Sequence, residues 1–354
     1  MIQRFTFGCP LPTESVVLPV EPAAAAVPYL TAEPDGSWSF SLAEDAVVYG
    51  LGEMPRGINK RGWHYVTDNT DESHHGENRL SYYGAHNFLL IDGGAGRSVF
   101  GVFVDFPGKV FYDIGYTRHD RLTFRTEEPD YDLYILTGDS PNAVCTEFRK
   151  LIGHSYIPPK WAFGFAQSRW GYKTEDDFRT VVKKYRENHV PLDMVYMDID
   201  YMQDYKDFTV NEERFPDFEG FVQDMKKEKI HLVPIIDAGV KVEEGYDIYE
   251  EGCEKGYFCR REDGSYFEAT VWPGWTHFPD VLNADARKWF GDKYDVLVSK
   301  GIDAFWNDMN EPSIFYSQEG LADFKETAKK YVEGDPEVPH YMVGGKLQAL
   351  ANNH

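Results

Sequence analysis

The sequence predicts a chain in two parts, an antiparallel β-sandwich over residues 1–140 and a parallel sheet with alternating helices over residues 158–354. The first part contains short β-rich runs separated by Gly and Pro turns, a pattern typical of sandwiches. The second part contains near-continuous apolar runs that alternate with helical patterns, which is typical of parallel β/α folds. Residues 141–157 are predicted to form a helical linker between the two parts.

The predicted sandwich consists of six β-rich runs, each bounded by a turn signal. Gly93-Gly94-Ala95-Gly96, Pro107-Gly108 and Glu128-Pro129 are three of these signals. The six runs are residues 47–49, 88–92, 98–105, 109–114, 122–125 and 131–136. A helical stretch over 141–152 follows, and Pro158-Pro159 marks the junction with the second part.

The second part contains four predicted strands, at 161–166, 192–197, 231–236 and 302–308. The helical pattern before the second strand opens with Thr174 to Asp177, which resembles a capping box. Apolar residues at helical spacing also occupy 218–225 and 285–300. This alternation predicts a parallel sheet, belonging either to a barrel or to a doubly wound fold.

Three of these strands end in aspartate: Asp198, Asp237 and Asp308 follow or close the last three apolar runs. The carboxyl ends of parallel strands meet at one edge of a sheet, so the three side chains are predicted to gather there. Alternation along the last strand places Trp306 beneath Asp308. An ordinary strand followed by an acidic turn explains one such run, but the repetition favours a site.

Composition excludes several classes of partner. The formal net charge of −23 argues against nucleic acid and disfavours anionic substrates and acidic membrane surfaces, while a neutral polar ligand remains allowed. No apolar run approaches 18 residues, and the start lacks the apolar core of a signal peptide, so neither a membrane span nor export is expected. Cys9, Cys145, Cys253 and Cys259 are scattered, which favours reduced thiols in a cytoplasmic protein.

Several short motifs together resemble family 31 glycoside hydrolases, the retaining α-glucosidases and their relatives. The most specific is Trp306-Asn307-Asp308-Met309-Asn310-Glu311, which is similar to the family's nucleophile signature. The supporting motifs are Tyr49-Gly50-Leu51-Gly52-Glu53, Tyr83-Gly84-Ala85-His86-Asn87-Phe88, Gln167-Ser168-Arg169-Trp170-Gly171-Tyr172, Met197-Asp198-Ile199-Asp200-Tyr201-Met202 and Trp272-Pro273-Gly274. The resemblance implies that the second part is a (β/α)8 TIM barrel, of which about the first four β/α units are present.

The resemblance also implies an activity, the release of glucose from the non-reducing end of α-linked gluco-oligosaccharides. Retaining hydrolysis uses two carboxyl groups about 5 to 5.5 Å apart. Asp308 is the implied nucleophile, and Glu311, which precedes Pro312, is expected to cap a helix instead. The acid/base residue is expected downstream of His354, so the chain by itself is expected to be inactive. No cofactor and no metal are implied.

The residues implied to contact the sugar are of two kinds. Carboxylates accept hydrogen bonds from hydroxyl groups, and tryptophan faces pack on the apolar side of a pyranose ring. For each tryptophan core packing is the alternative, and for Asp71 the alternative is a solvated acidic loop rather than one that reaches over the barrel mouth. A metal site at His74 and His75 is rejected for want of a third ligand. The implied substrate-binding residues are Asp71, Trp170, Asp198, Ile199, Trp272, Trp306 and Met309.

Three other functions stay open. Asp198-Ile199-Asp200 could hold a divalent cation in a metal-dependent transferase, although the sequence has no phosphate loop. An α-xylosidase or another family 31 activity would use the same nucleophile. A non-catalytic sugar-binding fragment is the third alternative. The sequence does not distinguish α-1,4 from α-1,6 linkages, and a homo-oligomer is compatible with it.

Overall fold

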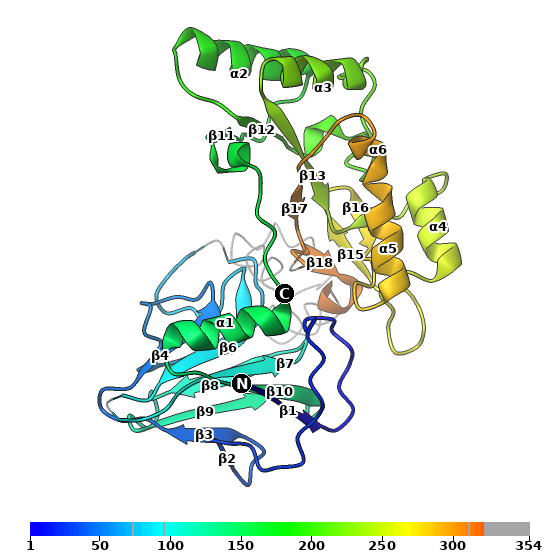
Figure 1. Cartoon of the computed structure of the whole chain (residues 1–354). Coiled ribbons are helices and arrows are strands. Elements are labelled where there is room, and N and C mark those ends of the chain that lie inside the picture. Colours follow the sequence, from blue (N-terminus) through cyan, green and yellow to red (C-terminus); the bar gives the residue numbers. More distant parts are fainter. Residues whose placement is uncertain (73, 95, 311, 322–354) are drawn as a thin grey trace, which may run out of the picture. The chain divides into compact units, whose positions relative to one another are not determined.

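Figure 1 shows the computed structural model of the chain, which describes residues 1–72, 74–94, 96–310 and 312–321. The chain divides into two compact units, Met1–Tyr156 and Ile157–His354. Within the described ranges, none of the helices combines the length and the apolar character that a bilayer crossing requires.

The first unit is the predicted antiparallel β-sandwich, built from two five-stranded sheets. The predicted runs form its strands, and the sequence analysis missed four more, β1, β2, β3 and β5. The first sheet has the order β1 (Ile2–Phe7), β10 (Tyr131–Thr137), β7 (Val99–Asp105), β6 (Ala85–Asp92) and β4 (Val47–Gly52). The second has the order β2 (Thr31–Ala32), β3 (Trp38–Ser41), β9 (Arg121–Thr126), β8 (Val110–Ile114) and β5 (Trp63–Thr67).

Strand β10 shows how the sandwich is packed on both faces of its first sheet. Leu133 and Ile135 belong to the core between the sheets, whereas Tyr134 and Leu136 belong to a second cluster on the opposite face. Successive side chains of a strand point to opposite faces, so this division follows from the period of two. Helix α1 (Pro141–Ile152) contributes Val144 and Leu151 to the second cluster, and therefore packs on the sandwich.

The second unit contains a four-stranded parallel sheet, the half barrel implied by the sequence. β12 pairs with β11 and β13, and β13 pairs with β17. All of these pairs are parallel, so their carboxyl ends lie at one edge. The sheet has the order β11 (Ala166–Gln167), β12 (Met194–Met197), β13 (His231–Asp237) and β17 (Trp306–Asp308).

Two helices connect the first three strands of this sheet in sequence. Helix α2 (Glu175–Glu187) begins at the predicted capping box, where Thr174 Oγ1 accepts from the Asp177 N–H (3.3 Å) and Asp177 Oδ2 accepts from the Thr174 N–H (2.9 Å). Helix α3 (Phe218–Lys227) buries the predicted apolar stripe. Phe218, Phe221 and Met225 of this stripe join the core of the unit.

A small antiparallel sheet, which the sequence analysis did not foresee, completes the second unit. In β15 and β16, Val271 pairs with Gly274, so Trp272 and Pro273 form a two-residue turn. Gly274 has φ of 103°, which favours glycine at the end of the turn. The sheet has the order β14 (Val240–Lys241), β16 (Gly274–His277), β15 (Glu268–Val271) and β18 (Tyr316–Ser317). Helix α4 (Asp247–Lys255) connects β14 to β15 in sequence. Helices α5 (Ala284–Lys293) and α6 (Asp295–Val298) follow β16 and precede β17.

Three elements of the second unit differ from the sequence prediction. Residues Lys160–Phe163 form the 3₁₀ helix η1 rather than a strand, and β17 begins at Trp306 rather than at 302. The two segments adjoin β11 and β17, which are the outer strands of the described sheet. Each outer strand pairs with a neighbour on one side only, so fewer of its residues are held in the sheet by hydrogen bonds. The helix predicted over 285–300 is divided at Tyr294 into α5 and α6.

Candidate active site

The register of the parallel sheet brings three carboxyl groups to one edge. Asp237 is the direct partner of Asp308 across β13 and β17. Asp198 follows Met197, the last residue of β12, which pairs with β13 on the other side. The charges of Asp198 and Asp308 act on one another and on Asp237. The structure therefore brings the three strand-end aspartates together (Figure 1 labels the three strands).

Asp198 is held by the short 3₁₀ helix η2 (Ile199–Tyr201) that begins after it. Its Oδ1 accepts a hydrogen bond from the N–H of Ile199 at 2.8 Å. Burial raises the pKa of Asp198, and the negative charges of Asp200 and Asp308 act in the same direction. Ile199 is buried in the core, so its contribution to a site is the backbone that orients Asp198.

Asp308 closes β17 and is followed by a strained residue. Met309 has φ of 59°, a left-handed conformation that residues other than glycine seldom adopt, and its side chain is buried. Such strain concentrates at functional sites. Trp306, two residues before Asp308, is half-buried and meets Tyr196 edge to face, with ring centroids 5.8 Å apart. Trp306 therefore lies at the border of core and site.

Asp237, one of the three predicted strand-end aspartates, forms a buried carboxyl pair with Asp207, which sequence reasoning missed. Asp207 Oδ1 accepts from the backbone N–H of Asp237 at 3.0 Å. Both oxygens of Asp237 and Oδ2 of Asp207 are buried without a hydrogen-bond partner in the described structure. Burial, followed by the charges of Asp308 and Asp198, raises the pKa of Asp237 to about 7. Burial, followed by the charge of Asp237, raises the pKa of Asp207 well above its usual range.

The two predicted tryptophans outside the strands lie together. The ring centroids of Trp170 and Trp272 are 5.5 Å apart, and Phe315 meets Trp272 edge to face at 4.9 Å. Trp170 is 59% exposed and Trp272 41% exposed, which argues against core packing as the role of either. Exposed neighbouring indoles offer apolar faces of the kind that sugar rings cover. Phe315 was missed because it lies beyond the last predicted strand, where no periodic pattern marks it.

The metal-clamp alternative finds no support in this geometry. Asp200 is only 2% exposed, and its Oδ1 lies 3.7 Å from Arg214 Nη1 and 3.9 Å from Lys173 Nζ. A carboxylate facing two cationic side chains is a poor ligand for a divalent cation. Among the described residues, no group of three or more His, Cys, Asp or Glu side chains is arranged to hold a metal ion.

A hollow of about 350 Å³ adjoins Asp308 and Asp237. Its walls include Phe278, Phe290 and Tyr294, so they are mainly apolar. Asp308 is the one predicted site residue among those that line it, whereas Trp170, Asp198, Ile199, Trp272, Trp306 and Met309 are not among the lining residues. Asp308 and Asp237 thus both border this hollow, and the hollow does not enclose all the predicted contacts.

Two predicted features cannot be joined to this edge. Asp71 lies in the first unit, where its Oδ1 accepts from the Tyr83 hydroxyl at 2.9 Å, so its reach over the barrel mouth stays a prediction. Glu311, predicted to cap a helix, lies outside the described residues.

Comparison with known proteins gives a consistent result over both units. Residues 155–344 match the glycosyl hydrolases family 31 TIM-barrel domain, and residues 28–113 match the glycosyl hydrolase 31 N-terminal galactose mutarotase-like domain. Alpha-glucosidase 2 of Bacillus thermoamyloliquefaciens is 38% identical over 279 residues, which cover 78% of this chain and 35% of that protein. The alpha-glucosidase of Saccharolobus solfataricus is 30% identical over 269 residues, covering 76% of this chain and 38% of that protein.

A solved structure shows the same fold. The GH31 dextranase of Flavobacterium johnsoniae, in a mutant complexed with isomaltotriose, superposes with a TM-score of 0.73 at 24% identity, covering 85% of this chain and 36% of that chain. The chain spans about a third of the length of these relatives. The family match covers more than half of the residues and agrees with the motifs and the two-part fold. The chain therefore belongs to glycosyl hydrolase family 31.

Proposed function

We propose that this chain supplies the N-terminal sandwich and the first half of the catalytic barrel of a retaining α-glucosidase. The enzyme releases glucose from the non-reducing end of α-linked gluco-oligosaccharides through a covalent glycosyl-enzyme intermediate on Asp308. Support comes from the family membership and from the two relatives named above, which are α-glucosidases. The observation that carries the proposal is the gathering of Asp198, Asp237 and Asp308 at the ends of three adjacent parallel strands.

Each residue has a role that its surroundings support. Asp308 attacks the anomeric carbon; its place at the end of β17, next to the strained Met309, supports this role. Asp198, fixed by the Ile199 N–H, accepts hydrogen bonds from sugar hydroxyls. Trp170 and Trp272 cover the apolar faces of the sugar rings. Preorganised groups of this kind stabilise the transition state without reorganising during the reaction.

The acid/base belongs to a residue downstream of His354. Asp237 titrates near neutrality, but it is 2% exposed and is paired directly beside Asp308 on the neighbouring strand. A proton donor must reach the leaving-group oxygen, across the scissile bond from the nucleophile. Asp237 is poorly placed for that task, and its electrostatic coupling to Asp308 suits it to tune the nucleophile instead.

Covalent trapping tests the proposal directly. The intact enzyme is incubated with 5-fluoro-α-glucosyl fluoride, digested and sequenced by mass spectrometry. We expect the label on Asp308 in wild type and no label in Asp308→Asn. The first sugar released from an aryl α-glucoside should have the α configuration by NMR. Label on another residue, or a β product, would contradict the assignment.

Substrate choice within the family needs a separate comparison. Hydrolysis rates of maltose, isomaltose and an aryl α-xyloside are measured side by side with the intact enzyme. We expect the gluco-configured substrates to be preferred, since the chain resembles α-glucosidases along most of its length. Faster cleavage of the xyloside would instead assign an α-xylosidase, with the same nucleophile.

The cytoplasmic location also belongs to this proposal. Cys9, Cys145, Cys253 and Cys259 are all free, as expected in a reducing compartment. Cell fractionation with an antibody against the chain would test the location.

A further inference from the structure

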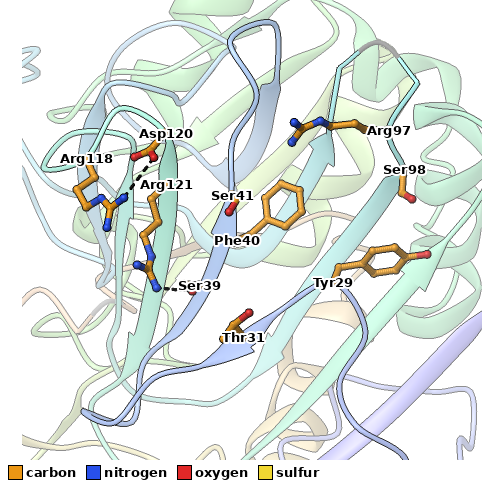
Figure 2. A pocket seen from close by; sticks show the side chains of 10 residues that line it. All are labelled: Tyr29, Thr31, Ser39, Phe40, Ser41, Arg97, Ser98, Arg118, Asp120 and Arg121. Atoms are coloured by element: carbon orange, nitrogen blue, oxygen red, sulfur yellow. Dashed lines mark hydrogen bonds and ion pairs between the residues drawn. The ribbon is translucent and has the colours of Figure 1, made fainter.

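The second sheet of the sandwich carries a hollow of about 460 Å³ that none of the roles above uses. This volume lies within the roughly 300–1,000 Å³ of typical small-molecule sites. Figure 2 shows Arg97 and Ser98 on one side of the hollow, Arg118, Asp120 and Arg121 on the other, and aromatic rings between them. The other lining residues are Tyr29, Thr31, Ser39, Phe40 and Ser41.

The aromatic part of the hollow packs on the core and is accessible to solvent. Tyr29 stacks on the buried Phe100 at 4.5 Å with an interplanar angle of 16°, and Phe40 meets Phe100 edge to face at 5.1 Å. Tyr29 is nevertheless 41% exposed. Its backbone has φ of 66°, a conformation that costs free energy for a residue other than glycine. An unfavourable backbone conformation that holds an aromatic ring exposed to solvent indicates ligand binding rather than core packing.

The polar part offers both donors and acceptors. Arg118 pairs with Asp120 at 3.2 Å, and the Arg121 guanidinium is anchored by Glu33 and by Ser39 Oγ, the latter at 2.8 Å. Arg97 is exposed, and in the described part of the chain no side chain forms an ion pair or a hydrogen bond with its guanidinium. Arginine donors beside a carboxylate acceptor suit the vicinal hydroxyls of a sugar, each of which donates and accepts.

From these observations we infer that the hollow formed by Tyr29, Phe40, Arg97, Arg118 and Asp120 is a second carbohydrate site, which binds a neutral α-gluco-oligosaccharide or the end of an α-glucan chain. A sugar ring stacks on the aromatic part, while Arg97 and the Arg118–Asp120 pair contact its hydroxyls. Two of the three arginines in the wall are already neutralised, Arg118 by Asp120 and Arg121 by Glu33, so a neutral ligand is preferred over an anionic one. The choice of an α-glucan, rather than another neutral sugar, rests on the proposed function.

The test is affinity electrophoresis of the intact protein through native gels containing glycogen. All variants carry Asp308→Asn so that the polymer is not consumed. We expect Tyr29→Ala and Arg97→Gln each to weaken the retardation by glycogen about tenfold, because each removes a stacking face or a charged donor. Tyr29→Phe, which keeps the stack on Phe100, should retain most of the binding, and thermal unfolding checks that Tyr29→Ala is folded.

Two controls locate the binding. Tyr156→Ala removes a tyrosine that is 82% exposed in the same unit but away from the hollow, and it should bind like the parent. Trp272→Ala alters the barrel, and it should leave most of the retardation in place. Absence of retardation in the parent, loss only in Trp272→Ala, or undiminished retardation in both hollow variants would overturn the inference. None of these outcomes bears on covalent trapping at Asp308, so the two proposals fail separately.

Discussion

The two units treat buried carboxyl groups in opposite ways. In the sandwich, Asp132 is 7% exposed, and its two oxygens accept from Arg4 Nε at 3.0 Å and Nη2 at 2.8 Å, with Thr6 Oγ1 at 2.6 Å from Oδ1. In the half barrel, Asp237 is 2% exposed and neither oxygen has a partner in the described structure. A buried carboxyl without partners is destabilising. The sandwich therefore uses its buried charge for stability, whereas the half barrel tolerates an unfavourable arrangement where the chemistry is proposed.

Asp308→Asn in the intact enzyme tests the functional side of this comparison, and has the largest expected effect. Removing the nucleophile abolishes covalent catalysis, so we expect kcat to fall by about 10⁴-fold or more while sugar binding persists. Steady-state kinetics and inhibitor titration measure the two effects. Glu311→Gln is the control; if Glu311 carries the chemistry, the two variants will exchange behaviours.

Arg4→Met tests the structural side. It leaves Asp132 buried beside one hydroxyl donor, and we expect the free energy of unfolding to fall by about 2–4 kcal/mol. Chemical denaturation measures the change. Lys183→Met, which breaks an exposed pair with Glu187, should cost less than about 0.5 kcal/mol. Equal effects of the two variants would show that the Arg4–Asp132 pair contributes no more than a surface pair.

Asp198→Ala should lower kcat/KM by one to two decades. A charged hydrogen bond to a sugar hydroxyl contributes roughly 1.5–3 kcal/mol to transition-state binding. The assay is repeated with a chelator, and wild-type activity should survive. Activity that requires added divalent metal would instead restore the metal-clamp reading of Asp198 and Asp200.

Asp237→Asn should change how stability depends on pH. Folding raises the pKa of Asp237 from 3.8 to about 7, so the unfolded chain loses this proton at lower pH than the folded chain. Asp237 therefore makes its whole contribution to the free energy of unfolding below pH 4. This contribution is lost as the pH rises to about 7. Asparagine stays neutral, and the variant should be more stable than wild type above pH 7 by up to about 4 kcal/mol, which is the shift from 3.8 to about 7 at 1.36 kcal/mol per pKa unit.

Thermal unfolding from pH 4 to pH 8 measures this difference. In Asp237→Asn, stability should depend less steeply on pH than in wild type. Some of the dependence should remain, because Asp207 also has a raised pKa. Asp204→Asn, at an exposed position three residues before Asp207, should follow wild type at every pH. A variant that is less stable than wild type above pH 7 would show that the ionised carboxyl has a partner in solution.

The features that were predicted correctly from the sequence are those that depend on residues close together in the chain. The capping box at Thr174, the apolar stripe of α3 and the aspartates at three strand ends each follow from residues close together in the chain. Strand lengths were predicted less well, because β11 and β17 depend on how many neighbours they pair with. Asp207 escaped notice because it lies in an irregular segment, and only the fold brings it against the backbone of Asp237.

The hairpin that carries Trp272 has a further consequence, for spectroscopy. Its tip is a two-residue turn containing Pro273, and it holds the Trp272 indole 5.5 Å from that of Trp170 at an angle of 45°. Two indoles at this separation and tilt couple their electronic transitions, and their circular dichroism in the aromatic bands depends on mutual orientation. A sugar that covers both rings would alter this signal and the fluorescence of both side chains. The molecule thus contains an optical reporter of ligand occupancy that is independent of turnover.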